Sequence, residues 1–163
     1  MHIIINKKYL IFGNYKVKCS IGKRGIKVKK REGDLITPKG KFKILFILYR
    51  KDRVPNLKSN IKKIIIKKNM GWCDDIRSNK YNQLVTYPFK FSSEKLYKKE
   101  NIYDVIFVLN YNYRPIKKNK GSAIFIHIAK KNYEKTAGCV AVKKKDIIKL
   151  ANLINSKTKI EIT

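Results

Sequence analysis

The sequence contains few of the residues that build metal centres or disulfide frameworks. Its 163 residues include three cysteines and two histidines, and no C-x-x-C pair occurs. A zinc site would have to draw on scattered residues, and an odd number of cysteines does not fit a disulfide framework. We therefore predict no metal and interpret Cys19 and Cys73 as small buried hydrophobic residues. A single disulfide bridge stays open for a protein of an oxidising compartment.

Long apolar runs are also absent. Residues 1–12 are apolar only in short bursts that Lys7 and Lys8 interrupt, and they contain no signal-peptide core and no small-residue cleavage site. No stretch approaches the length of a transmembrane helix. The sequence thus predicts a soluble chain with no visible signal peptide.

Acidic residues are scarce, with 11 Asp and Glu against 40 Lys and Arg and a formal net charge of +29. Such an excess favours an anionic partner such as nucleic acid. An AT-rich genome explains it equally well, because only six of the basic residues are arginine and because Ile and Asn are also abundant. Proteins that read base sequence favour arginine, and no helix-turn-helix, zinc-finger or RRM-type motif is present. A sequence-specific nucleic-acid partner is therefore not expected.

The hydrophobic pattern predicts one mainly β domain over residues 1–163. Short β-branched or aromatic runs indicate strands at residues 2–6, 9–12, 15–20, 42–49, 61–67, 103–110, 121–129 and 159–162. A glycine-rich loop is expected between Gly22 and Gly40. One helix is predicted over Ser92–Lys99 from a serine N-cap, and another near residues 143–155 from the one-face spacing of apolar residues.

His127 and Cys139 are the strongest candidates for chemistry. A thiol becomes a strong nucleophile as the thiolate, and a nearby imidazole is the usual group that takes its proton. Strand alternation puts His127 on one face with Phe125. Gly138 allows a sharp turn before the cysteine that brings amide N–H groups near an attacked carbonyl, and the Thr136 hydroxyl can brace this turn. Taken alone, each of the two candidates is more often a packing residue.

The segment Gly71–Asp75 holds a second group of candidates. It carries the only tryptophan, Trp72, and two of the few acidic residues, Asp74 and Asp75. In so basic a chain, paired acids either hold a substrate cation or fix a loop through salt bridges, and the structural role is preferred. Trp72, Asp74 and Asp75 are kept as candidates for substrate binding.

Several ordered motifs give the chain a resemblance to a known family. The motifs are Glu32–Phe42 (EGDLITPKGKF), Gly71–Asp75 (GWCDD), Gly121–His127 (GSAIFIH) and Thr136–Ala141 (TAGCVA). Over residues 19–150 the chain resembles the L,D-transpeptidase (YkuD-type) catalytic domain of bacterial peptidoglycan metabolism. The commoner form of the last motif is Ser/Thr-His-Gly-Cys-x-Arg/Asn, and here Ala137 stands in place of its histidine and Ala141 in place of its Arg or Asn. The resemblance is therefore to a divergent branch.

The resemblance implies a single-domain β-sandwich or barrel and a cysteine acyltransferase. It makes Cys139 the nucleophile that attacks the carbonyl joining diaminopimelate, at stem-peptide position three, to D-alanine at position four. It makes His127 the general base and acid, oriented by the carbonyl of Ile128. The amides of Gly138 and Cys139 would bind the oxyanion, with Thr136 in support. No cofactor is implied.

The fate of the acyl-enzyme stays open at this point. It would pass to the diaminopimelate amine of a second stem peptide, forming a 3–3 cross-link, or to water, as in a carboxypeptidase. A further alternative is an inactive basic domain that binds an anionic polymer through its lysines. The implied location is the cell envelope or periplasm, with the cytoplasm left open because no signal peptide is visible. The sequence does not indicate an oligomeric state.

Overall fold

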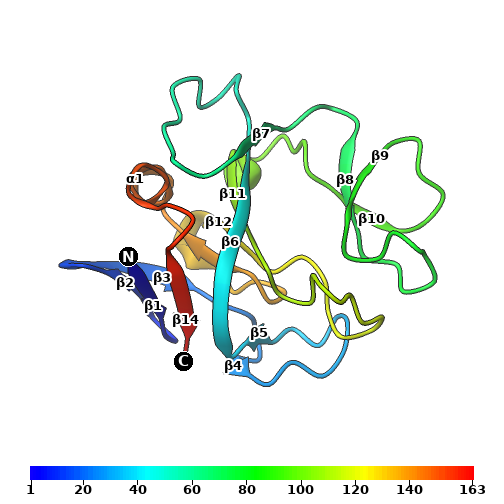
Figure 1. Ribbon diagram of the computed structural model, residues 1–163, viewed down its shortest axis with the longest axis horizontal. Helices are drawn as coiled ribbons and strands as arrows, with labels where there is room; N and C mark the ends of the chain where they lie inside the picture. The colour runs from blue at the N-terminus through cyan, green and yellow to red at the C-terminus, as the bar shows by residue number, and fades with distance from the viewer.

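The computed structural model describes residues 1–163 and has the predicted mainly β architecture (Figure 1). The strands are β1 (His2–Ile5), β2 (Tyr9–Phe12), β3 (Tyr15–Ser20), β4 (Ile26–Lys27), β5 (Thr37–Pro38), β6 (Gly40–Tyr49), β7 (Lys63–Ile65), β8 (Met70–Cys73), β9 (Leu84–Thr86), β10 (Ser93–Lys95), β11 (Val105–Leu109), β12 (Phe125–Ile128), β13 (Val140–Val142) and β14 (Lys159–Ile162). The helical elements are the 3₁₀-helices η1 (Asn101–Tyr103) and η2 (Lys131–Tyr133) and the α-helix α1 (Lys144–Leu153). None of the helical segments has both the length and the apolar character that a bilayer crossing needs.

The main sheet closes on itself into a barrel. Its strands follow the order β11-β12-β13-β3-β2-β1-β14-β6-β7, and β6 also pairs with β11. The long strand β6 makes this closure possible, because its first half pairs with β14 and its second half with β11, both antiparallel. The N- and C-terminal strands β1 and β14 lie side by side in parallel register (Figure 1).

The barrel interior is filled by alternate residues of its strands. In β1, Ile3 and Ile5 are fully buried while Ile4 stays exposed, as the pleat requires. Helix α1 adds Ile147 and Leu150 to the same apolar cluster, which confirms the helix predicted near residues 143–155.

A second apolar cluster lies on the outer face of β11 and β12. The three-stranded sheet β10-β8-β9 covers this face, and the rings of Trp72 in β8 and Phe125 in β12 pack perpendicular to each other at 5.2 Å between centroids. Strand β12 is therefore buried on both sides, with Ile126 and Ile128 in the barrel interior and Phe125 in the outer cluster. This arrangement confirms the predicted split of faces along β12.

The helix predicted over Ser92–Lys99 is wrong. Ser93–Lys95 instead forms strand β10, which pairs antiparallel with β8. The N–H of Ser92 donates to Asp75 Oδ2 at 3.3 Å, which ties the start of this segment to the neighbouring loop. Ladder pairing with β8 thus outweighs a local cap signal, which is worth only about 1 kcal/mol.

Candidate active site

One cavity of about 460 Å³ brings together most of the residues that the sequence singles out. Its lining includes His127, Cys139, Trp72 and Asp74, together with the turn Thr136–Gly138. These residues come from β8 and the position just after it, from the outer face of β12 and from the segment just before β13. The cavity therefore lies between the barrel wall and the sheet β10-β8-β9.

The parallel pairing of β12 and β13 sets the two candidate chemical groups beside each other. In this register His127 lies opposite Ala141 and Ile126 opposite Val140, so Cys139 comes level with Phe125 at the start of β12. Accordingly, the Phe125 N–H donates to Cys139 Sγ at 3.4 Å. The imidazole and the thiol thus line the same cavity on the same side of the sheet.

Hydrogen bonding fixes the protonation of the His127 ring. Nδ1 lies 2.9 Å from the carbonyl oxygen of Ile128, which can only accept, so Nδ1 carries the proton and Nε2 is free to act as a base. The ring is 8% exposed and packs edge-on against Tyr103 at 5.4 Å between centroids. Burial lowers the pKa of His127, so the imidazole is neutral at pH 7.

Cys139 is held as a neutral thiol. Its Sγ donates to the carbonyl oxygen of Ala123 at 3.0 Å, and burial raises its pKa to about 12. No hydrogen bond joins the thiol to the His127 ring in this structure. The resting site therefore contains a neutral thiol and a neutral imidazole in one cavity, not a thiolate–imidazolium pair.

The turn before Cys139 depends on Thr136 and Gly138. The Thr136 hydroxyl donates to the carbonyl oxygen of Cys139 at 2.5 Å and accepts the Gly138 N–H at 3.1 Å. Gly138 has φ +147°, and a Cβ there would lie 2.9 Å from the carbonyl oxygen of Ile36, so only glycine fits. Of the two amides expected to bind an oxyanion, that of Gly138 is thus already engaged. The Cys139 N–H donates to no protein group.

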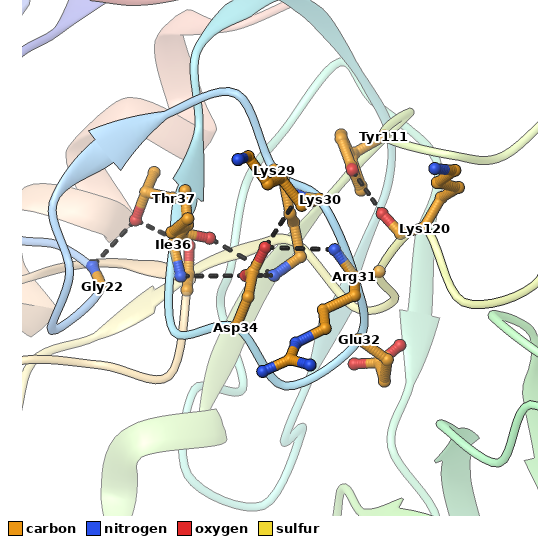
Figure 2. A network of polar contacts seen from close by, with 12 residues as sticks. Gly22, Lys29, Lys30, Arg31, Glu32, Asp34, Ile36, Thr37, Tyr111 and Lys120 are labelled. Carbon is orange, nitrogen blue, oxygen red and sulfur yellow. Dashed lines mark hydrogen bonds and ion pairs between the residues drawn. The ribbon is translucent and has the colours of Figure 1, made fainter.

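The segment between Gly22 and Gly40, predicted as a loop, contacts this turn, and Figure 2 shows the polar network within the segment. It contains the two short strands β4 and β5. The Thr37 hydroxyl donates to the carbonyl oxygen of Gly138 at 2.8 Å and accepts the Gly22 N–H at 2.8 Å. The loop therefore reaches the turn before Cys139 through a buried side chain of the Glu32–Phe42 motif.

Asp34 organises the same segment. Its carboxylate accepts the Lys29 ammonium at 2.5 Å and the backbone N–H groups of Lys30 and Ile36, and Figure 2 shows these bonds converging on it. The side chains of Lys29 and Asp34 are each 3% exposed. Burial raises the pKa of Asp34, but the ammonium and the backbone N–H groups outweigh it and bring the pKa down to about 2.

The two acids of the Gly71–Asp75 segment have different surroundings. Asp75 accepts hydrogen bonds from the guanidinium and backbone N–H of Arg77 and does not line the cavity. Its candidacy for substrate binding is therefore corrected, because Arg77 and the Ser92 N–H occupy its carboxylate and fix the loop. Asp74 lines the cavity, and its Oδ1 atom is buried without a hydrogen-bond partner.

Two residues that the sequence does not single out hold the site together. Asn82 Oδ1 accepts the indole N–H of Trp72 at 3.0 Å and the backbone N–H of Ala123 at 3.0 Å. Ala123 has φ +48°, an uncommon conformation for a residue other than glycine, and its carbonyl receives the Cys139 thiol. Asn82 lies 41 positions before Ala123, so no local pattern reveals the contact.

Comparison with known proteins gives one family match. The model of the L,D-transpeptidase catalytic domain (YkuD) matches residues 2–162. No curated protein matches the chain. Among solved structures, that of Bd1075 from Bdellovibrio bacteriovorus is similar, with a TM-score of 0.48 and 18% sequence identity. The match covers 99% of this chain and 46% of that chain, so the present chain spans about half the length of that protein.

Proposed function

Because the chain belongs to the YkuD family of L,D-transpeptidase catalytic domains, we propose that residues 1–163 form one catalytic domain, a cysteine-dependent L,D-transpeptidase acting on peptidoglycan stem peptides. The observation that carries the proposal is that His127 and Cys139 line one cavity, with Nε2 as the unprotonated ring nitrogen. A thiol and a free imidazole nitrogen in one cavity suit acyl transfer. Peptidoglycan as substrate places the enzyme in the cell envelope.

In the first half-reaction, the Cys139 thiol leaves the Ala123 carbonyl and gives its proton to His127 Nε2. The sulfur attacks the carbonyl between diaminopimelate and D-alanine, and the Cys139 N–H donates to the oxygen that becomes negative. The tetrahedral adduct then breaks its C–N bond, and the imidazolium returns the proton to the departing amine of D-alanine. The products are free D-alanine and a thioester on Cys139.

The neutral resting pair determines how the thiol is activated. Since the pKa of Cys139 is about 12 and that of His127 is lowered, a thiolate is scarcely populated before substrate binds. The proton therefore moves as the sulfur attacks, with His127 acting as a general base during bond formation. The resting thiol is thereby protected from oxidation, because oxidants react with the thiolate.

In the second half-reaction, the side-chain amine of diaminopimelate from a second stem peptide attacks the thioester. His127 Nε2 takes a proton from the attacking nitrogen and passes it to the sulfur as the C–S bond breaks. The product is a 3–3 cross-link and a free Cys139 thiol. If water attacks instead, the product is a free tripeptide and the enzyme is a carboxypeptidase.

Incubation with a disaccharide tetrapeptide tests the proposal. We expect release of D-alanine with formation of a cross-linked dimer, measured by liquid chromatography and mass spectrometry. His127→Ala should lower the rate by about 10²–10⁴-fold because the general base is lost, while Cys19→Ala, which changes a buried thiol outside the cavity, should act like wild type. Tripeptide without dimer would assign hydrolysis, and no release of D-alanine would contradict the proposal.

A further inference from the structure

Among the carboxylates of the cavity wall, that of Asp74 is the one without a protein partner. Its Oδ1 is the single buried side-chain oxygen or nitrogen in the molecule without a hydrogen-bond partner. Its position is fixed from both sides, because the Asp74 N–H donates to the Ser92 carbonyl and the Cys73 N–H to that of Gln83. These two bonds fix the backbone around Asp74, which lines the cavity, and no protein group forms a hydrogen bond with its buried Oδ1 atom.

The other carboxylates that line the cavity all have partners. Glu94 accepts the Tyr103 hydroxyl at 2.7 Å and pairs with Lys98 at 3.2 Å. Glu134 pairs with Lys130 at 3.2 Å, and Glu32 accepts the hydroxyl of Tyr81. Asp74 alone remains free, and it differs in this from its neighbour Asp75, which Arg77 occupies.

This contrast is unexpected in a chain with 40 basic residues. Five lysines line the same cavity, and none forms an ion pair with Asp74: Lys23, Lys29, Lys98, Lys130 and Lys135. A buried, unpaired carboxylate oxygen is costly, and such groups in native proteins call for a specific explanation. A metal ion does not supply one, because no group of three ligand-type side chains is gathered anywhere in the structure. A positively charged group of a bound ligand does.

The chemistry of the two half-reactions decides which amine this is. A carboxylate contact favours the charged form of an amine and raises its pKa. The acceptor amine must be neutral to attack the thioester, so Asp74 would oppose its reaction. The side-chain amine of the donor diaminopimelate takes no part in bond making and remains an ammonium throughout. It is therefore the group that suits Asp74.

We propose that Asp74 binds the side-chain ammonium of the donor diamino acid and so selects the stem peptide whose carbonyl Cys139 attacks. This inference rests on the proposed function and names a specificity residue for it. Lys23 and Lys135, which line the cavity without forming ion pairs, suit the carboxylate on the same diamino acid.

Binding to the inactive Cys139→Ala variant tests this without turnover. The probes are a disaccharide tetrapeptide with a free diaminopimelate side-chain amine and the same compound with that amine acetylated, and affinity is measured by titration calorimetry. Acetylation should weaken binding to Cys139→Ala by about 10–100-fold, as expected for loss of a partly buried charge pair. With Asp74→Asn added, acetylation should change the affinity less than about twofold.

Glu134→Gln in the same background is the matched control. It removes one negative charge from the same cavity wall but from a carboxylate that already has a lysine partner, so the preference for the free amine should persist. Asp74→Ser serves as a second variant if Asp74→Asn melts at a lower temperature than its parent.

The inference is overturned if Cys139→Ala binds both compounds equally, or if Asp74→Asn keeps the preference. A parallel loss of affinity for both compounds would also overturn it, because that indicates a structural role. Failure of the proposed function has a separate sign, since it appears as absent release of D-alanine by the wild-type chain with every residue in place.

Discussion

His127 combines two features that act on its chemistry in the same direction. The Ile128 carbonyl fixes the tautomer so that Nε2 is unprotonated, and burial lowers the ring's pKa. In the proposed reaction, the base must be unprotonated to accept the thiol proton, and both features keep His127 in that form at neutral pH. The Tyr103 ring packs against one side of the imidazole.

A dependence of acylation on pH follows from the lowered pKa. Protonation of His127 blocks the base, and its pKa lies below the ordinary value of about 6.5. The rate constant kcat/KM for release of D-alanine should therefore stay level from pH 8 to about 6.5 and fall only at lower pH. Timed assays of D-alanine release at each pH check this, and circular dichroism at the same pH values shows whether the protein stays folded. A fall that begins above pH 7 would show that the ring is not held neutral by burial.

Among individual residues, the sequence predicts those that are marked by a short motif of neighbouring residues. His127, Gly138 and Cys139 stand in short motifs, and the brace by Thr136 spans only three positions. Asn82 could not be predicted, and neither could the contacts of Ala123 within the Gly121–His127 motif, because these contacts join segments far apart in the chain. The engagement of the Gly138 amide by Thr136 depends on turn geometry that motif spacing does not specify.

Among the elements, the loop between Gly22 and Gly40 matters most to the site. Lys29 and Asp34 form an almost completely buried ion pair within the loop. The Thr37 hydroxyl links the loop to Gly138 by a hydrogen bond to its carbonyl oxygen. A buried pair contributes little net stability, but loss of one partner leaves an uncompensated charge. Substitution of one residue of this pair is therefore expected to destabilise the loop.

Asp34→Asn should lower the free energy of unfolding by about 3–5 kcal/mol, because Lys29 loses its buried counter-charge. Urea denaturation at pH 7 measures the difference. Glu134→Gln is the control. The side chains of Glu134 and Lys130 are 61% and 57% exposed, so their ion pair should contribute less than about 1 kcal/mol to the free energy of unfolding. An effect of Asp34→Asn no larger than that of the control would contradict the assigned role.

The folded pKa of Asp34, about 2, lies below its ordinary value, so the carboxylate stabilises the folded state above about pH 4. That contribution should disappear as the pH falls from about 4 towards 2. In Asp34→Asn this part of the acid dependence should be missing.

The strands show which parts of the fold a sequence pattern reveals. Each predicted strand overlaps an observed one, since runs such as 42–49, which lies within β6, are long and rich in apolar residues. Strands β4, β5, β8, β9, β10 and β13 escape prediction, because so short a strand carries little alternation of apolar and polar residues. The sequence predicts a helix over Ser92–Lys99 for the same reason, since only pairing with β8 determines the conformation of this segment.

Over the whole molecule, the site is built from parts that only the closed barrel brings together. Pairing of β6 with β11 and with β14 closes the barrel, and the sheet β10-β8-β9 then covers its outer face and forms the cavity. The hydrophobic pattern of each segment does not reveal which strands, far apart in the sequence, pair with each other. The family resemblance, which the match over residues 2–162 confirms, anticipates the barrel where periodicity alone predicts only strands.

The net charge of +29 is also a property of the whole chain. The structure contains eight ion pairs, so most of the lysines have no acidic partner. A strongly positive surface favours the approach of any anion, stem peptides with their free carboxylates included. Charge therefore does not separate a transpeptidase from a basic binding domain, and the decision depends on Cys139.

The most direct test is intact-mass spectrometry of the native chain after exposure to a carbapenem, which acylates a nucleophilic cysteine without needing an acceptor. The account predicts one adduct of the mass of the carbapenem on the wild-type chain and none on Cys139→Ala, while Cys73→Ala, which alters a fully buried thiol, keeps it. An unchanged wild-type mass after prolonged exposure, or an adduct that persists in Cys139→Ala, would contradict it.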